Sequence, residues 1–132
     1  MSVRDPIADV VSRIKNASRV GLPTVTVTYS RLKESILKVL AEEGFIGDVQ
    51  VVGEGARKNI VLQLKYGPQE TPVISDIRLV SKLGCRVYVS KRDIKPLKQG
   101  AGVALLTTPR GILTDTKAKK IGVGGEVILT VW

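Results

Sequence analysis

The sequence predicts an α+β fold made of two small packed domains. Three observations support this prediction: helical and strand-like patterns alternate in the first half, short strands dominate the second half, and a segment rich in proline and glycine, residues 67–72, separates them. A length of 132 residues suits two half-domains of this kind. We therefore expect an N-terminal α/β domain over residues 1–67 and a mainly β domain over residues 68–132.

The N-terminal domain is expected to run helix, strand, helix, strand, strand. Asp5 is a good N-cap and Pro6 suits the first helical position, so the first helix begins there and ends near Gly21. The second helix follows Ser30 as its N-cap and ends at Gly44. Apolar residues at helical spacing predict the buried stripes, which are Ile7, Val10, Val11, Ile14 and Ala17 in the first helix and Leu32, Ile36, Val39 and Leu40 in the second.

Stretches rich in β-branched residues, several of them strictly alternating, predict the strands. The expected strands cover residues 24–28, 45–52, 59–66, 73–80, 86–89, 103–107 and 127–131. One short helix over residues 115–121 follows Thr114 as its cap. Residues 91–100 are too charged and too often interrupted to assign.

The charge of the chain points toward a polyanionic partner. The net charge is +9 with no histidine, and residues 69–132 carry +6 of it. Nucleic acid is the first partner to consider, because its phosphates attract basic proteins whatever the sequence. An anionic lipid surface or an acidic protein would also fit, so charge alone does not decide between these classes.

The composition disfavours several other classes of protein. Cys85 is the only cysteine, so an intrachain disulfide is excluded, and a zinc site without histidine is poorly supported. Cys85 has the cationic neighbour Arg86, but the sequence shows no base and no oxyanion site beside this thiol. The first residues resemble no signal peptide, and no apolar run reaches the ~20 residues that span a bilayer. We expect no enzyme activity, no cofactor, no metal and no membrane association.

The segment Thr107–Gly111 is the first candidate for a nucleic-acid contact. The Thr107 and Thr108 hydroxyls can donate and accept hydrogen bonds, Arg110 adds a forked cation, and Gly111 lets the backbone come close to a ligand. The alternative is an ordinary turn after a strand, where threonine, proline and glycine are common.

Two further segments of the second half offer candidate contacts. The lysines of residues 117–120 suit a phosphate-facing patch or the solvated face of a short helix. The glycines of residues 122–125 lack the ending of a nucleotide-binding loop, so a tight turn is the default, and Glu126 either orients basic side chains or accepts a hydrogen bond. Tyr88 offers a ring for base stacking beside Lys91 and Arg92, or else it is a half-buried strand residue.

The sequence resembles the S-eight family of bacterial-type small-subunit ribosomal proteins over essentially its whole length. The resemblance is carried by the opening segment, residues 5–17, by residues 86–89, and above all by residues 102–119 with the Gly122–Glu126 turn and Trp132. It implies two helices on a three-stranded sheet, followed by a mainly β part with one helix.

The resemblance also implies what the protein does. Such proteins bind the central domain of 16S rRNA and help to assemble the platform of the 30S subunit, beside other small-subunit proteins in the cytoplasm. Some members also repress translation of their own messenger RNA. We expect this chain to be a monomer outside the ribosome.

The principal RNA contact of the family is a Ser-Thr-Ser loop, which corresponds here to Thr107, Thr108 and Pro109. Pro109 has no hydroxyl and no amide hydrogen, so either the two threonines carry the polar contacts or the proline packs against a sugar or base. The candidate RNA-binding residues are Thr107, Thr108, Arg110, Gly111, Tyr88, Lys91, Arg92, Gly124, Gly125, Glu126 and Lys119, with Arg4, Asp5, Pro6, Arg13 and Asn16 from the N-terminal segment.

Overall fold

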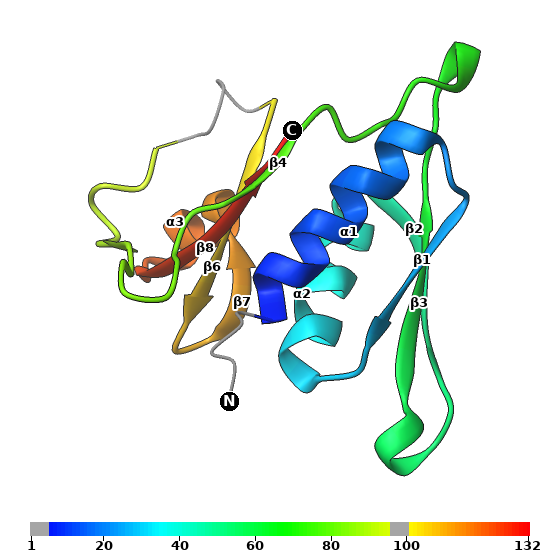
Figure 1. Ribbon diagram of the computed structural model, residues 1–132. Helices are drawn as coiled ribbons and strands as arrows, with labels where there is room; N and C mark the ends of the chain where they lie inside the picture. Colours follow the sequence, from blue (N-terminus) through cyan, green and yellow to red (C-terminus); the bar gives the residue numbers. More distant parts are fainter. Residues whose placement is uncertain (1–5, 96–100) are drawn as a thin grey trace. The chain divides into compact units, whose positions relative to one another are not determined.

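The computed structural model describes residues 6–95 and 101–132 (Figure 1). These residues divide into two compact units, Pro6–Ser75 and Asp76–Trp132. The first holds helices and a sheet, and the second is mainly β with one helix, so the predicted α+β class is confirmed. The predicted domain limits of 1–67 and 68–132 remain a prediction.

The first unit is a three-stranded antiparallel sheet covered by two helices. The sheet has the order β1-β3-β2, and both helices lie on one face of it in Figure 1. Its core is formed by the apolar faces of both helices and of the three strands. The elements are α1 (Pro6–Val20), β1 (Thr24–Thr28), α2 (Arg31–Glu42), β2 (Ile46–Val52) and β3 (Asn59–Leu64), with 3₁₀ turns at Gly55–Arg57 and Pro68–Glu70.

Helix α1 follows the predicted pattern. The five predicted core residues of this helix are all buried. On its exposed side, Arg13 pairs with Asp9 one turn earlier at 3.0 Å between Nε and Oδ2. Such an exposed pair contributes at most ~0.5 kcal/mol, so burial of the apolar stripe is the main contribution to the stability of the helix.

Helix α2 begins as predicted, and Ile36 and Leu40 of its predicted stripe are buried, but the rest of the buried face differs. The Ser30 hydroxyl accepts a hydrogen bond from the Lys33 amide, as expected of an N-cap. The predicted stripe is wrong at Leu32, which is 45% exposed, and Val39 is only partly buried. The inward positions belong to Lys33 and Leu37 instead.

Lys33 takes an inward position because its ammonium group finds partners there. The Nζ atom donates to the Thr28 carbonyl at 3.2 Å and to the Thr28 hydroxyl at 2.8 Å, while the residue is only 5% exposed. A buried charge is tolerated only with such hydrogen bonds. The apolar pattern alone gives no sign of this, which explains why it indicated Leu32.

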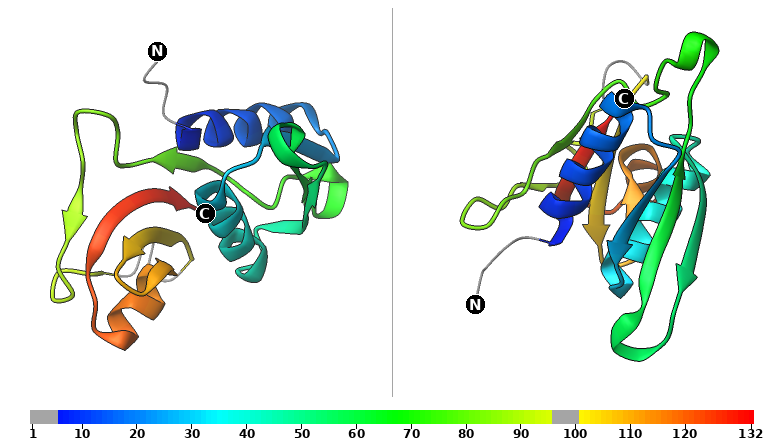
Figure 2. Two further views of the ribbon diagram at one scale, coloured as in Figure 1. Left: turned by 90° about the horizontal axis from the view of Figure 1, so that it is seen from below. Right: turned by 45° about the vertical axis from the view of Figure 1, so that its right-hand side comes forward.

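The second unit is a five-stranded antiparallel sheet with one short helix. Strand β8 lies at its centre: it pairs with β6 along one edge and with both β4 and β5 along the other, and β7 pairs with β6. Strand β8 is strongly curved (Figure 2). The elements are β4 (Ile77–Leu79), β5 (Tyr88–Val89), β6 (Val103–Thr108), β7 (Gly111–Thr114), α3 (Asp115–Ile121) and β8 (Gly125–Val131).

Two features of this unit differ from the sequence prediction. Strands β4 and β5 are much shorter than the predicted 73–80 and 86–89. Strand β7 was not predicted, because only two apolar residues stand between Gly111 and the helix cap at Thr114, too few to show alternation. Helix α3 has the predicted bounds, and its core contact is Ala118, which packs with Leu106 and Ile94.

Candidate nucleic-acid interface

Four side chains form a row across the sheet of the second unit. Tyr88 of β5 lies opposite Glu126 of β8, which lies opposite Thr107 of β6, which lies opposite Ile112 of β7. Directly opposed residues point to the same face of a sheet, so these four share one face. We call them the outer row, because Tyr88 is 70% exposed and Thr107 is also exposed.

The exposure of Tyr88 resolves one of the open alternatives. A half-buried strand tyrosine is ruled out, since most of the side chain faces solvent. An exposed aromatic ring on a strand is the arrangement that single-stranded or splayed bases stack upon.

Glu126 is held in the middle of the outer row by an ion pair. Its Oε2 atom lies 3.3 Å from Nη1 of Arg86, and both side chains are partly exposed. An exposed pair of this kind adds little stability. The pair places a positive charge beside the Glu126 carboxylate and so offsets its negative charge.

The Thr107–Gly111 segment is the tight connection of the β6–β7 hairpin. Thr108 and Gly111 are paired, so Pro109 and Arg110 form the exposed tip. Gly111 has φ of 101°, a conformation that costs other residues steric strain. The two readings of this segment, turn and polar surface, are therefore compatible.

The two threonines of this loop face in different directions. Thr107 is exposed on the outer row, whereas Thr108 is only 8% exposed. The Thr108 hydroxyl donates to the Gly111 carbonyl at 2.8 Å and accepts from the Arg110 amide at 3.0 Å. The structure thus separates two residues that the sequence treated alike.

Gly124 and Gly125 have a structural reason to be glycine. A Cβ atom on Gly124 would overlap the carbonyl oxygen of Val89, and one on Gly125 would overlap the carbonyl oxygen of Thr107. The backbones of β5 and β6 therefore approach β8 as closely as they do only because both side chains are absent. This accounts for both glycines without a ligand and leaves their predicted contact with RNA as a prediction.

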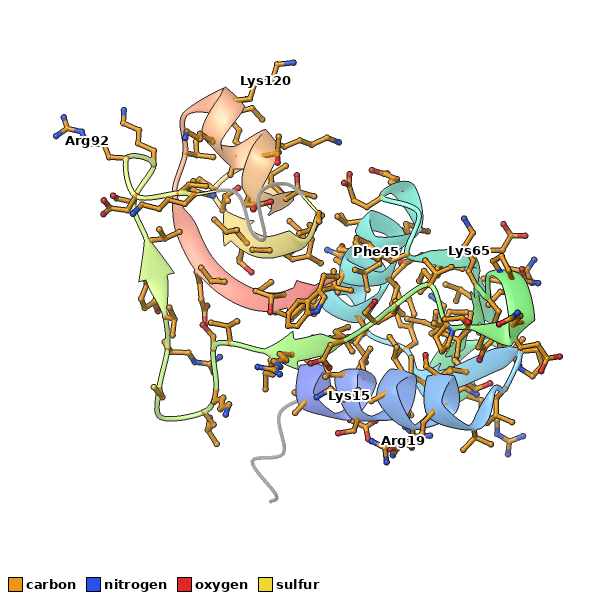
Figure 3. The ribbon with its side chains drawn as sticks, turned by 90° about the horizontal axis from the view of Figure 1, so that it is seen from above. Lys15, Arg19, Phe45, Lys65, Arg92 and Lys120 are labelled. Atoms are coloured by element: carbon orange, nitrogen blue, oxygen red, sulfur yellow. The ribbon has the colours of Figure 1, made fainter. Side chains whose placement is uncertain are left out.

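The second unit also carries exposed candidate cations outside the outer row. Lys91 and Arg92 lie in an exposed turn after β5, where the Ser90 hydroxyl donates to Asp93 at 2.9 Å. Lys119 is exposed on α3 together with its neighbouring lysines. Figure 3 shows Arg92 and Lys120 extending into solvent. These exposed side chains offer positive charge to a polyanionic partner.

The N-terminal candidates belong to the other compact unit or lie outside the described residues. Pro6, Arg13 and Asn16 are exposed residues of α1, and Arg13 also donates to the Thr26 carbonyl at 3.5 Å. Arg4 and Asp5, including the predicted N-cap role of Asp5, lie outside the described residues.

Other kinds of site find little support in the part of the chain that the structure describes. No cluster of three or more cysteine or acidic side chains is placed to hold a metal ion. No helix there is both long and apolar enough to cross a membrane. Cys85 is an exposed residue of the turn that joins β4 to β5.

Two residues of this surface were absent from the predicted set. Ile112 completes the outer row, and Arg86 fixes Glu126. Ile112 was missed because its strand was missed, although Thr-Pro-Arg-Gly after a strand is a hairpin signal. Arg86 was noted for its charge, but no pattern in the sequence links it to a residue forty positions later.

Comparison with known proteins gives a single consistent result. The family model described as ribosomal protein S8 matches residues 5–132. The chain is 51% identical to the small ribosomal subunit protein uS8 of Dictyoglomus thermophilum over the whole of both chains. It is 47% identical to that of Synechococcus elongatus, again over both whole chains, and 46% identical to that of Thermus aquaticus over 97% of this chain and 98% of the relative. The chain therefore belongs to the ribosomal protein S8 family.

Proposed function

We propose that this chain is a structural component of the small ribosomal subunit that binds the central domain of 16S rRNA through the outer row and the hairpin tip beside it. Membership of the ribosomal protein S8 family supports the ribosomal role and agrees with the prediction that the chain is not an enzyme. The observation that carries the proposal is the outer row itself, in which Tyr88, Glu126 and Thr107 share one face of the sheet.

The chemistry of the proposed surface is recognition alone. The Tyr88 ring stacks on an unpaired base, and the Thr107 hydroxyl and the Glu126 carboxylate meet base edges or ribose hydroxyls. Arg110 at the hairpin tip supplies a fork for a phosphate or a base edge. Lys91, Arg92 and Lys119 would add sequence-independent attraction to the phosphates.

The proposed place of the protein is the cytoplasmic ribosome, next to other small-subunit proteins, where its binding would help to assemble the platform. The N-terminal candidates Arg4, Asp5, Pro6, Arg13 and Asn16 would add a second contact with rRNA. The proposed repressor activity would use the same face, because a messenger RNA that imitates the rRNA site presents the same chemistry. Competition between rRNA and messenger fragments for the purified protein distinguishes a repressor from a protein that binds rRNA only.

A binding experiment with two substitutions tests the proposal. Arg110→Ala and Thr107→Val should each weaken binding to a transcribed central-domain fragment of 16S rRNA, by ~1–3 kcal/mol if a specific contact is lost. The dissociation constant is measured at two salt concentrations, because phosphate attraction depends on salt.

The chain offers a matched control for each substitution. Arg57→Ala removes an exposed arginine from the first unit, and Thr24→Val replaces an exposed strand threonine there. Both controls should leave the affinity within about twofold of the unaltered protein. Unchanged affinity for Arg110→Ala and Thr107→Val alike would rule out the hairpin as the RNA contact.

A further inference from the structure

The Thr108 hydroxyl makes two hydrogen bonds within its own loop. It accepts a hydrogen bond from the Arg110 amide at 3.0 Å and donates its proton to the Gly111 carbonyl at 2.8 Å. The residue is 8% exposed, in a loop whose other members are exposed. A hydroxyl has one proton to donate, so Thr108 has no donor left for a ligand.

These two hydrogen bonds link Thr108, at the start of the hairpin tip, to Arg110 and Gly111 at its end. A threonine that accepts a hydrogen bond from the amide two residues later forms a side-chain turn that imitates a backbone turn. Pro109 stands at the second position of the same turn, where its fixed φ is favoured and no amide hydrogen is needed. Gly111 supplies the positive φ that completes the connection.

We propose that Thr108 is a positioning residue, which holds the hairpin tip in its RNA-binding conformation before RNA arrives. This inference rests on the proposed function, in which the tip contacts rRNA. Thr108 acts by turning the Arg110 amide inward, which fixes the direction in which the Arg110 side chain leaves the loop. A loop that is ordered in the free protein loses less conformational entropy on binding.

The same arrangement gives Pro109 a role of its own. With proline at this position the loop loses a hydroxyl, but the hydrogen bonds of the tip are made by Thr108 and need nothing from residue 109. Pro109 narrows the conformations open to the unbound loop. Rigidity supplied by Thr108 and Pro109 would thus offset the polar group that this chain lacks.

Two substitutions at position 108 test the inference in the free protein. Thr108→Val keeps the branched shape but removes both hydrogen bonds, and Thr108→Ser keeps the hydroxyl. Amide hydrogen exchange at Arg110, followed by NMR, should be ~5–10-fold faster in Thr108→Val and nearly normal in Thr108→Ser. Thr107→Val should leave this exchange rate unchanged. Normal exchange in Thr108→Val would overturn the inference.

Binding to the 16S rRNA fragment then shows whether Thr108 acts through Arg110. Thr108→Val should lower the affinity ~5–10-fold, and Thr108→Ser should restore it. In an Arg110→Ala background, Thr108→Val should lower the affinity by less than about twofold, because the Arg110 side chain that Thr108 positions is already absent. The same loss in both backgrounds would make Thr108 a direct contact.

The exchange and binding measurements together distinguish a failure of this inference from a failure of the proposed function. If Arg110→Ala weakens binding but Thr108→Val changes neither exchange nor affinity, the tip is the RNA contact and Thr108 does not position it. If Thr108→Val accelerates exchange while neither Arg110→Ala nor Thr107→Val affects RNA binding, the tip is ordered by Thr108 but is not the site.

Discussion

At the scale of single residues, the candidate interface depends on two glycines, Gly124 and Gly125. Gly124 and Gly125 bring β8 against the backbones of Val89 and Thr107, which sets the spacing of the outer row. Glycine usually weakens a strand. Its presence here is explained by packing, because any larger residue would overlap the neighbouring backbone.

Replacement of Gly125 by alanine tests this reading. The new Cβ would overlap the Thr107 carbonyl, which is backbone and cannot rotate away, so the free energy of unfolding should fall by ~1–3 kcal/mol. Gly67→Ala is the matched control, because its Cβ would lie 3.7 Å from the nearest backbone oxygen, and it should change stability by less than ~0.5 kcal/mol. Urea denaturation measures both; equal stabilities would show that the strands can separate without cost.

The residue scale is also where the sequence was least informative. Thr107 and Thr108 are identical neighbours, and only the hairpin geometry shows that one faces solvent and the other closes the loop. Lys33 is buried where Leu32 was expected, because the two hydrogen bonds that its ammonium group donates to Thr28 outweigh the apolar pattern. Both outcomes depend on partners brought close by folding, which a periodic pattern does not contain.

At the scale of elements, the capping residues at both ends of helix α3 contribute to its stability. Seven residues are too few for a stable isolated helix. The Thr114 hydroxyl accepts from the Lys117 amide at 3.2 Å, and Gly122 ends the helix in the left-handed conformation. These end signals are local, which explains why the sequence predicted this helix correctly although β7 just before it was missed.

Loss of the cap should therefore destabilise the second unit. Thr114→Ala removes the acceptor for the Lys117 amide and should lower the free energy of unfolding by ~0.5–2 kcal/mol. Thr114→Ser keeps the hydroxyl and should recover most of this loss. Thr116→Ala, at an exposed position of the same helix, serves as the control and should change stability by less than ~0.5 kcal/mol. A Thr114→Ala protein as stable as the control would mean that packing of Ala118 alone holds the helix.

At the scale of the whole molecule, charge governs how the protein meets RNA. The net charge of +9 is concentrated in the second half of the chain, which also holds the outer row. The affinity for RNA should fall steeply as salt is added, since phosphate contacts release counterions.

The contribution of one lysine can be read from that salt dependence. Lys119→Ala should weaken binding to cognate and unrelated RNA alike and reduce the slope of log K against log salt by up to ~1. Lys65→Ala removes the same charge from an exposed residue of the first unit that is not among the proposed contacts, and it should leave the slope unchanged. An unaltered slope for Lys119→Ala would place that lysine away from the phosphates.

The global architecture was easier to predict than the details of the surface. Helix spacing, capping residues and turn residues are local signals, and they gave the fold class together with most elements. The outer row joins residues from four strands, and some of these residues are far apart in the sequence, such as Tyr88 and Glu126. The resemblance to a known family pointed to Tyr88, Thr107 and Glu126, but not to Ile112.

The register of strand β8 limits which insertions and deletions the protein can tolerate. The strand pairs on both edges, and its Val127 packs toward the buried cluster while the adjacent Glu126 belongs to the outer row. Moving the strand by a single residue would exchange the two and put a carboxylate into the core. An insertion or deletion within β8 itself would force this exchange, so folding of the core protects the alignment of the proposed RNA-binding surface.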